Sequence, residues 1–318
     1  MWNRSVLFKR GFQVVLLGVV VVVLTACQEE FQPAQVEEPH PLVVEGYIEA
    51  SGDLSSPPYV FLTRSFPFFN QISGEQFDAF FVHDADVRVS DGEREVRLIE
   101  LCFADLSEDQ IDLAENFLGR ELDSLGINLC VYLDPTFTII GEEGKTYDLT
   151  IEAEGELLTA TTTIPEQVEL DSVFFVEPPG EPRDTLAQLR VILDDPPEEN
   201  FYRYFVSVDG GEFKRDDFSV FNDRLFNDER LEFPLNRPLG DDESFDLSTF
   251  GLFRRGTDMT LKFAFLDEAH HQFWETLEFA SANQGPFSSY TRIATNINGG
   301  LGIWGGLACT YYDRAVPE

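Results

Sequence analysis

The sequence predicts a mainly β protein: an N-terminal β-sandwich of immunoglobulin-like or fibronectin-like architecture with a helical insertion, followed by a second β-rich domain with one C-terminal helix. Three observations predict this class. Short runs of alternating apolar and polar residues recur at intervals of about ten residues. Gly and Asp turn signals such as Asp91-Gly92 separate the runs. Phe, which packs well on pleated surfaces, occurs 30 times against 2 Met.

The first 26 residues have the pattern of a signal peptide, with basic residues, an apolar run over 14–24 and small residues before Cys27. Leu-Thr-Ala-Cys resembles the bacterial lipobox, in which the cysteine sulfur takes a diacylglycerol and the peptide is cut before it. An uncleaved membrane anchor is the alternative. It is the weaker one, because the apolar run is shorter than the ~20 residues that a spanning helix needs. We therefore expect lipidation at Cys27 and a membrane attachment through that lipid.

Acidic residues follow the predicted lipidation site at once. Gln28, Glu29 and Glu30 resemble the export signal that sends Bacteroidota lipoproteins to the outer face of the outer membrane. An ordinary acidic tether is the alternative. The Pro-rich and Glu-rich composition then continues to residue 41, which predicts an extended tether over 27–41.

The net charge of the chain is strongly negative. It is −36, and the signal peptide contributes +3, which leaves −39 (−36 − 3) for the mature chain. Nucleic-acid binding needs basic patches that displace counterions, so we expect no nucleic-acid partner. The same charge disfavours direct contact with an anionic lipid surface.

The first folded domain is predicted over 42–166. Ser107 is a plausible N-cap for a helix over 108–125, which has helical spacing of its apolar residues and stops at Gly126. Pro165 ends the last strand of the domain. We expect strands over residues 42–48, 59–64, 86–90, 94–101, 129–133, 144–152 and 156–164.

The second domain is predicted over 167–318. Asp267 is placed to cap a helix running to about residue 282. The Gly-dense stretch 296–306 lacks the Lys-Ser/Thr of a phosphate loop, so we interpret it as a tight structural seam between the last strand and its neighbours. We expect strands over residues 168–176, 187–193, 201–208 and 259–266, and a last one through Tyr312.

Three cysteines remain after Cys27. Cys102 and Cys130 lie at the two ends of the helical insertion, where a disulfide would close its base. Whether they pair is left open at this point. Cys309 would then be free, and the absence of a nearby histidine cluster argues against a zinc site.

The sequence contains no recognisable combination of catalytic residues that would indicate a particular reaction. His270 and His271 are adjacent on the predicted helix and point in different directions, so we interpret them as surface histidines. Calcium binding in the acidic segment 209–246 is an alternative, but the loop spacing of a calcium site is missing. We therefore assign no catalytic residue, metal or cofactor. The aspartates of that segment are Asp216, Asp217, Asp223, Asp228, Asp241, Asp242 and Asp246.

An aromatic-rich stretch is the remaining candidate site. Phe66, Phe68 and Phe69 crowd one segment around Pro67. A loop with so many apolar side chains either packs them against the rest of the protein or uses them to contact a partner. The sequence alone is compatible with both interpretations.

Three stretches carry a resemblance to a family: the lipobox followed by 42–48, the hairpin from 144 to 165, and the closing segment 295–306. In these the chain resembles the Bacteroidota lipoproteins grouped as domain of unknown function 4249. The resemblance covers essentially the whole mature chain. It implies a partner of a TonB-dependent outer-membrane transporter in nutrient uptake, and it supplies no site residues.

The predicted function is therefore that of a non-enzymatic lipoprotein on the cell surface, which assists such a transporter or captures its substrate. A stand-alone adhesion or interaction lipoprotein is the first alternative. An unrecognised hydrolase that uses carboxylates is the second.

Overall fold

The computed structural model describes residues 40–65, 79–107, 110–111, 128–180, 184–216, 219–240, 243–283 and 291–318. Some predicted features lie outside these ranges. They are the signal peptide, most of the tether and nearly all of the predicted insertion helix.

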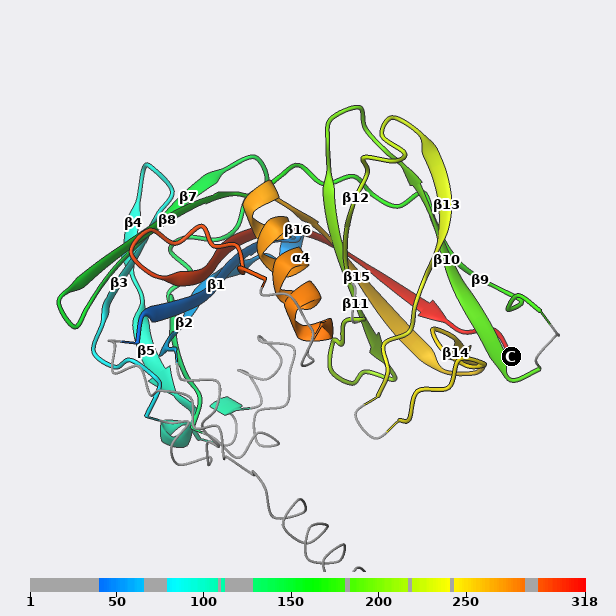
Figure 1. Ribbon diagram of the computed structural model, residues 1–318, viewed down its shortest axis with the longest axis horizontal. Coiled ribbons are helices and arrows are strands. Elements are labelled where there is room, and N and C mark those ends of the chain that lie inside the picture. Colours follow the sequence, from blue (N-terminus) through cyan, green and yellow to red (C-terminus); the bar gives the residue numbers. More distant parts are fainter. Residues whose placement is uncertain are drawn as a thin grey trace, which may run out of the picture. The chain divides into compact units, whose positions relative to one another are not determined.

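An eight-stranded sheet, here called sheet A, is the central element of the fold (Figure 1). Its strand order is β12-β11-β15-β16-β1-β2-β6-β5. The first and last strands of the chain, β1 and β16, pair in parallel at its middle, and the other neighbours are antiparallel. The strands are β1 (Leu42–Ala50), β2 (Ser56–Arg64), β5 (Ile99–Cys102), β6 (Cys130–Leu133), β11 (Phe201–Val208), β12 (Val220–Asn222), β15 (Asp258–Leu266) and β16 (Leu301–Ala315).

The described part of the chain also forms two four-stranded sheets. One has the order β4-β3-β7-β8, and the other has β13-β10-β14 with β9 paired to β10. The structure also describes the short helices η1 (Gly52–Leu54) and η2 (Phe103–Asp105) and the longer helix α4 (Glu268–Ala282). The strands of the two smaller sheets are β3 (Asp86–Ser90), β4 (Glu95–Arg97), β7 (Thr146–Ala153), β8 (Glu156–Thr163), β9 (Ser172–Val176), β10 (Leu186–Asp194), β13 (Arg230–Leu235) and β14 (Phe253–Arg254).

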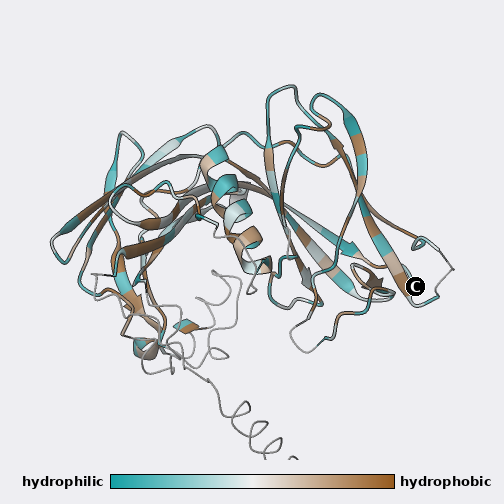
Figure 2. Cartoon of the chain, viewed as in Figure 1, coloured by the Kyte–Doolittle hydropathy of each residue, from teal (hydrophilic) through white to brown (hydrophobic). Residues whose placement is uncertain are grey.

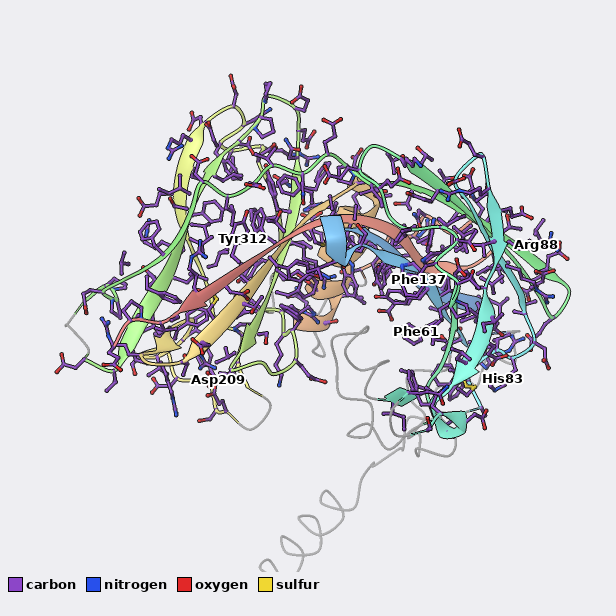
Figure 3. All side chains as sticks on the ribbon, turned by 180° about the vertical axis from the view of Figure 1, so that it is seen from behind. Phe61, His83, Arg88, Phe137, Asp209 and Tyr312 are labelled. Atoms are coloured by element: carbon purple, nitrogen blue, oxygen red, sulfur yellow. A yellow bond between two sulfur atoms is a disulfide. The ribbon has the colours of Figure 1, made fainter. Side chains whose placement is uncertain are left out.

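The main core joins one face of sheet A to both smaller sheets. Successive side chains of a strand point to opposite faces, so alternate residues of the sheet A strands enter one continuous apolar cluster. Trp304 of β16 is fully buried there, and its indole N–H donates to the Tyr147 carbonyl at 3.0 Å. Tyr312, labelled in Figure 3, accepts a hydrogen bond from the Leu170 amide at 2.7 Å. Figure 2 shows the mixture of hydrophobic and hydrophilic residues along these strands.

The glycines of β16 allow the close approach of β1 on one side and of the residue that follows β8 on the other. Gly302 has a φ of +101°, and a Cβ there would lie 1.9 Å from the Val44 carbonyl oxygen. A Cβ on Gly306 would lie 2.9 Å from the Ile164 side chain. The Gly-dense stretch is thus a structural seam, as its sequence predicts.

The predicted mainly β class with a C-terminal helix is confirmed. Asp267 caps α4, because its side chain accepts a hydrogen bond from the His270 amide at 2.8 Å. The domain boundary between residues 166 and 167 stays a prediction. Sheet A contains strands from both sides of it, and residues 40–318 form one compact unit.

Candidate functional site

The face of sheet A that turns away from the main core carries α4 and a set of aromatic and charged side chains. We call it the α4 face. The helix contacts β16, β12 and β11, and a second apolar cluster lies beneath it. The polar and aromatic members that concern the site are Glu45, Tyr47, Glu49, Tyr59, Phe61, Arg203, Phe205, Lys262 and Tyr311, with Cys309 among them.

An ion pair between Lys262 and Glu49 lies on this face, where β15 and β1 flank β16. Tyr311 donates its hydroxyl to the same carboxylate at 2.7 Å. The ammonium also lies 5.5 Å from the Tyr311 ring centroid and 5.8 Å from that of Phe205. Burial alone would lower the pKa of Lys262, but the Glu49 carboxylate raises it, and the net pKa is well above its ordinary value. Lys262 is therefore a permanent cation set against aromatic rings.

A second cation, Arg203 of β11, is buried between α4 and the sheet. Its Nε donates to Ser219 Oγ at 3.1 Å, and one terminal nitrogen lies 3.4 Å from Glu278 of α4. Its guanidinium stacks on Trp274 at 3.7 Å and on Phe205 at 4.9 Å from the ring centroids. Burial lowers its pKa to about 10, so the group stays charged at neutral pH.

The two adjacent histidines are buried, so the prediction of surface histidines is wrong. His270 is 0% exposed and packs with a tilted ring against Tyr47, with 5.6 Å between ring centroids. His271 is 3% exposed and packs with a tilted ring against Phe201, with 4.9 Å between ring centroids. The two rings do point to different neighbours, as adjacent helical positions require. They are buried because the first turn of α4 is pressed against sheet A.

Three ionisable groups of the α4 face have pKa values that are shifted away from neutral pH. Burial, followed by the charge of Arg203, lowers the pKa of His270 to about 3. Burial raises the pKa of the Cys309 thiol and of the Tyr311 hydroxyl, and Glu49 adds to both shifts. A general acid or base needs a pKa near the working pH. These three groups are therefore poorly suited to moving protons near neutral pH.

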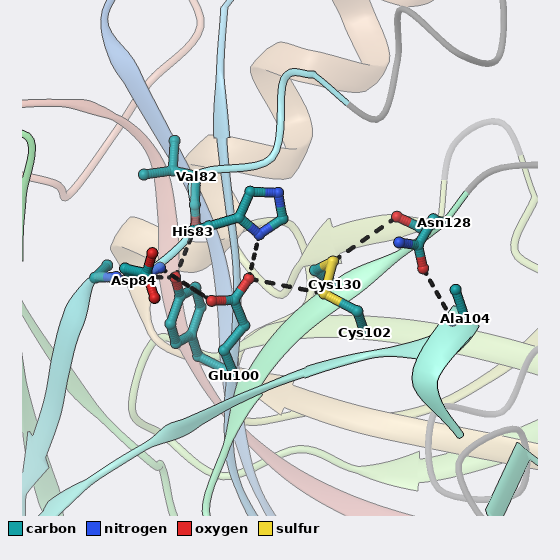
Figure 4. Close-up of a disulfide and its surroundings, with 10 residues drawn as sticks. Val82, His83, Asp84, Glu100, Cys102, Ala104, Asn128 and Cys130 are labelled. Atoms are coloured by element: carbon teal, nitrogen blue, oxygen red, sulfur yellow. Dashed lines mark hydrogen bonds and ion pairs between the residues drawn. A yellow bond between two sulfur atoms is a disulfide. The ribbon is translucent and has the colours of Figure 1, made fainter. Parts of the chain in front are cut away.

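A disulfide joins Cys102 of β5 to Cys130 of β6, the pair considered from the sequence (Figure 4). Beside it, the Glu100 carboxylate pairs with the His83 ring. Glu100 also accepts hydrogen bonds from the Asp84 amide at 3.0 Å and from the Tyr132 hydroxyl at 3.3 Å. Cys309 is free and buried.

The acidic segment 209–246 gives no support to calcium binding. Asp216 accepts a hydrogen bond from the Asn236 amide group at 2.8 Å, and Asp223 accepts one from the Asn200 backbone at 2.6 Å. Within the described ranges, this segment contains no group of three His, Cys, Asp or Glu side chains placed to hold a metal ion. Asp217, Asp241 and Asp242 lie outside those ranges.

Several predicted site residues lie outside the described part of the chain. These are the lipidation site Cys27, the export residues Gln28, Glu29 and Glu30, and the candidate contact residues Phe66, Phe68 and Phe69. Arg203 and Lys262 were not predicted as site residues from the sequence. Their signal was a charged residue among alternating aromatic and apolar positions, in Phe201-Tyr202-Arg203-Tyr204-Phe205 and Leu261-Lys262-Phe263.

The sequence model of one family, described as Domain of unknown function (DUF4249), matches residues 28–311. The chain belongs to the DUF4249 family. No curated protein matches this DUF4249 chain. In the part of the chain that the structure describes, no helix combines the length and the apolar character needed to cross a bilayer.

Proposed function

We propose that this DUF4249 protein is a non-enzymatic lipoprotein of the outer-membrane surface, and that it assists a TonB-dependent transporter or captures its substrate. The observation that carries the proposal is the composition of the α4 face. Tyr59, Phe205, Lys262 and Tyr311 are each partly exposed there. Aromatic rings with fixed charges are characteristic of surfaces that bind partners or ligands.

The proposed cellular location of the protein is supported by its N-terminal sequence and by its cysteines. The lipobox at Cys27 and the acidic residues behind it favour an outer-membrane surface location. The Cys102–Cys130 disulfide supports export, because disulfides persist in oxidising compartments.

Binding is favoured over catalysis by the electrostatics of the face. Lys262 is paired with Glu49, and Arg203 with Glu278, so the fixed charges are balanced and held in place. Such prearranged charges and rings cost little conformational entropy when a partner docks.

Affinity purification of the full-length chain from detergent-solubilised outer membranes tests the proposal. We expect a β-barrel transporter to co-purify in near-equal amount. Tyr59→Ser combined with Phe205→Ser should lower its recovery at least about five-fold, because each aromatic anchor contributes on the order of 1 kcal/mol. Phe245→Ser is the matched control, since Phe245 is 65% exposed and lies outside sheet A.

The alternatives give different outcomes in the same experiment. A stand-alone adhesion protein would purify without a barrel partner. A hydrolase would show turnover that a carboxylate substitution abolishes. If the double variant recovers as much barrel as the wild type does, the α4 face is not the surface that binds the transporter.

A further inference from the structure

Four metal-ligating side chains, none of them among the residues that define the α4 face, meet beside β5 and β6, at one end of the strand order of sheet A. Cys102 and Cys130 are direct register partners on β5 and β6. Glu100 lies two residues before Cys102 on β5, and therefore on the same face of that strand. His83 comes from the segment that precedes β3. One ligand atom from each of the four lies within 4.8 Å of the others.

Figure 4 shows the carboxylate of Glu100 between the His83 ring and the two sulfur atoms. Its Oε1 lies 3.7 Å from Cys102 Sγ and also pairs with His83 Nδ1. The Asp84 amide and the Tyr132 hydroxyl hold the other carboxylate oxygen. Such partners orient a ligating carboxylate and fix the direction of its free lone pairs.

Once the sulfurs are reduced, the four groups are all of ligand types that bind Zn²⁺ in proteins. Two thiolates, one imidazole and one carboxylate suit tetrahedral Zn²⁺, whose structural sites take four such ligands. In the disulfide the sulfurs are bonded to each other and are not thiolate ligands. The site is also accessible from one side, because the His83 side chain is 51% exposed while Cys130 is buried.

We propose that reduction of the Cys102–Cys130 disulfide by a dithiol opens a Zn²⁺ site made of His83, Glu100, Cys102 and Cys130. The dithiol gives up two electrons and two protons and becomes a disulfide. The S–S bond between Cys102 and Cys130 breaks, and each sulfur becomes a thiol. Zn²⁺ then displaces the two thiol protons to solvent and forms two Zn–S bonds, and it replaces the hydrogen bond between His83 and Glu100.

This proposal is independent of the proposed function, since its residues and its chemistry differ from those of the α4 face. It gives the His83–Glu100 pair a role as metal ligands. A disulfide that only stabilised the fold would not need this pair beside it. It also predicts that the oxidised chain binds the metal poorly, because only two of the four ligands are then available.

Cobalt binding to the purified full-length chain tests the proposal. The disulfide is reduced anaerobically with a phosphine, the phosphine is removed, and Co²⁺ is added as a spectroscopic substitute for Zn²⁺. We expect one Co²⁺ per reduced chain, with thiolate-to-cobalt charge-transfer absorption and the strong visible bands of a tetrahedral site. Equimolar Zn²⁺ should abolish both signals, and the oxidised chain should show neither.

Variants separate this site from adventitious thiol binding. His83→Gln and Glu100→Gln should each weaken Co²⁺ binding at least about ten-fold. His40→Gln and Cys309→Ala are the controls and should leave it unchanged. The proposal is overturned if the reduced chain gives no tetrahedral spectrum, if reduction unfolds the chain, or if the His83 and Glu100 variants bind as the wild type does.

Discussion

Gly302 of β16 lies directly against the Val44 carbonyl of β1, and a Cβ on Gly302 would come within 1.9 Å of that oxygen. The contact lies at the centre of sheet A, where the two ends of the folded chain pair in parallel. The α4 face depends on this pairing, because β1 carries Glu49 and β16 carries Tyr311.

Gly302→Ala should therefore lower the free energy of unfolding by about 2–4 kcal/mol, from backbone strain at a φ of +101° and from steric overlap with β1. Denaturant unfolding measures the loss. Gly155→Ala is the control, because Gly155 also has a positive φ, +86°, but no atom within 4 Å of the added Cβ. We expect about 1 kcal/mol there, and equal losses at the two sites would contradict the account.

Buried His270 should make the protein less stable in acid. The unfolded chain binds a proton on this side chain below pH 6.5, whereas the folded chain does so only near its pKa of about 3. The unfolded state thus holds more protons in that window, and the free energy of unfolding falls as the pH drops through it, by up to about 1.4 kcal/mol per pH unit. Unfolding curves at several pH values measure this slope.

Carboxyl groups also titrate between about pH 3 and 6.5. The dependence of the free energy of unfolding on pH must therefore be compared between variants. His270→Leu should lose the part of the slope that His270 contributes. Parallel curves for the wild type and His270→Leu would show that His270 does not remain neutral in the folded chain.

Glu278→Gln should lower the free energy of unfolding by about 3–5 kcal/mol, because it leaves the buried guanidinium of Arg203 without its counterion. Removing both charges with Arg203→Leu and Glu278→Leu should cost less than this single change. Thermal and denaturant unfolding of the three variants make the comparison. A single variant as stable as the wild type would mean that the pair is not coupled.

The Cys102–Cys130 disulfide should contribute about 3–4 kcal/mol, because its cysteines are 28 residues apart and it restricts the unfolded chain. Replacing both cysteines with Ala should lower the midpoint of denaturant unfolding accordingly. Adding a reductant to the double variant should change nothing further. A second loss on reduction would indicate that another thiol or disulfide is involved.

The local parts of the fold could be predicted from the sequence. The hairpin of β7 and β8 has clean alternation and a Gly turn, and its strands pair across a short turn. The start of α4 follows from the cap at Asp267. Both features depend on neighbouring residues alone.

The remaining features depend on contacts between distant segments. The parallel pairing of β1 with β16 joins Val43 to Leu301, and no local pattern specifies it. Arg203 contacts Glu278, which lies 75 residues further along the chain. The burial of His270 and His271 was likewise hidden, because it depends on which surface α4 packs against. The sequence therefore predicted the elements but not the face that they form together.

Photo-crosslinking in living cells tests the central claim most directly. A photoreactive amino acid is placed at Phe205 on the α4 face and, as the control, at Phe245 outside sheet A, and mass spectrometry identifies the crosslinked proteins. We expect a TonB-dependent outer-membrane barrel to be crosslinked from position 205 and not from position 245. Crosslinks from position 205 that contain no such barrel, or equal barrel crosslinking from both positions, would contradict this expectation.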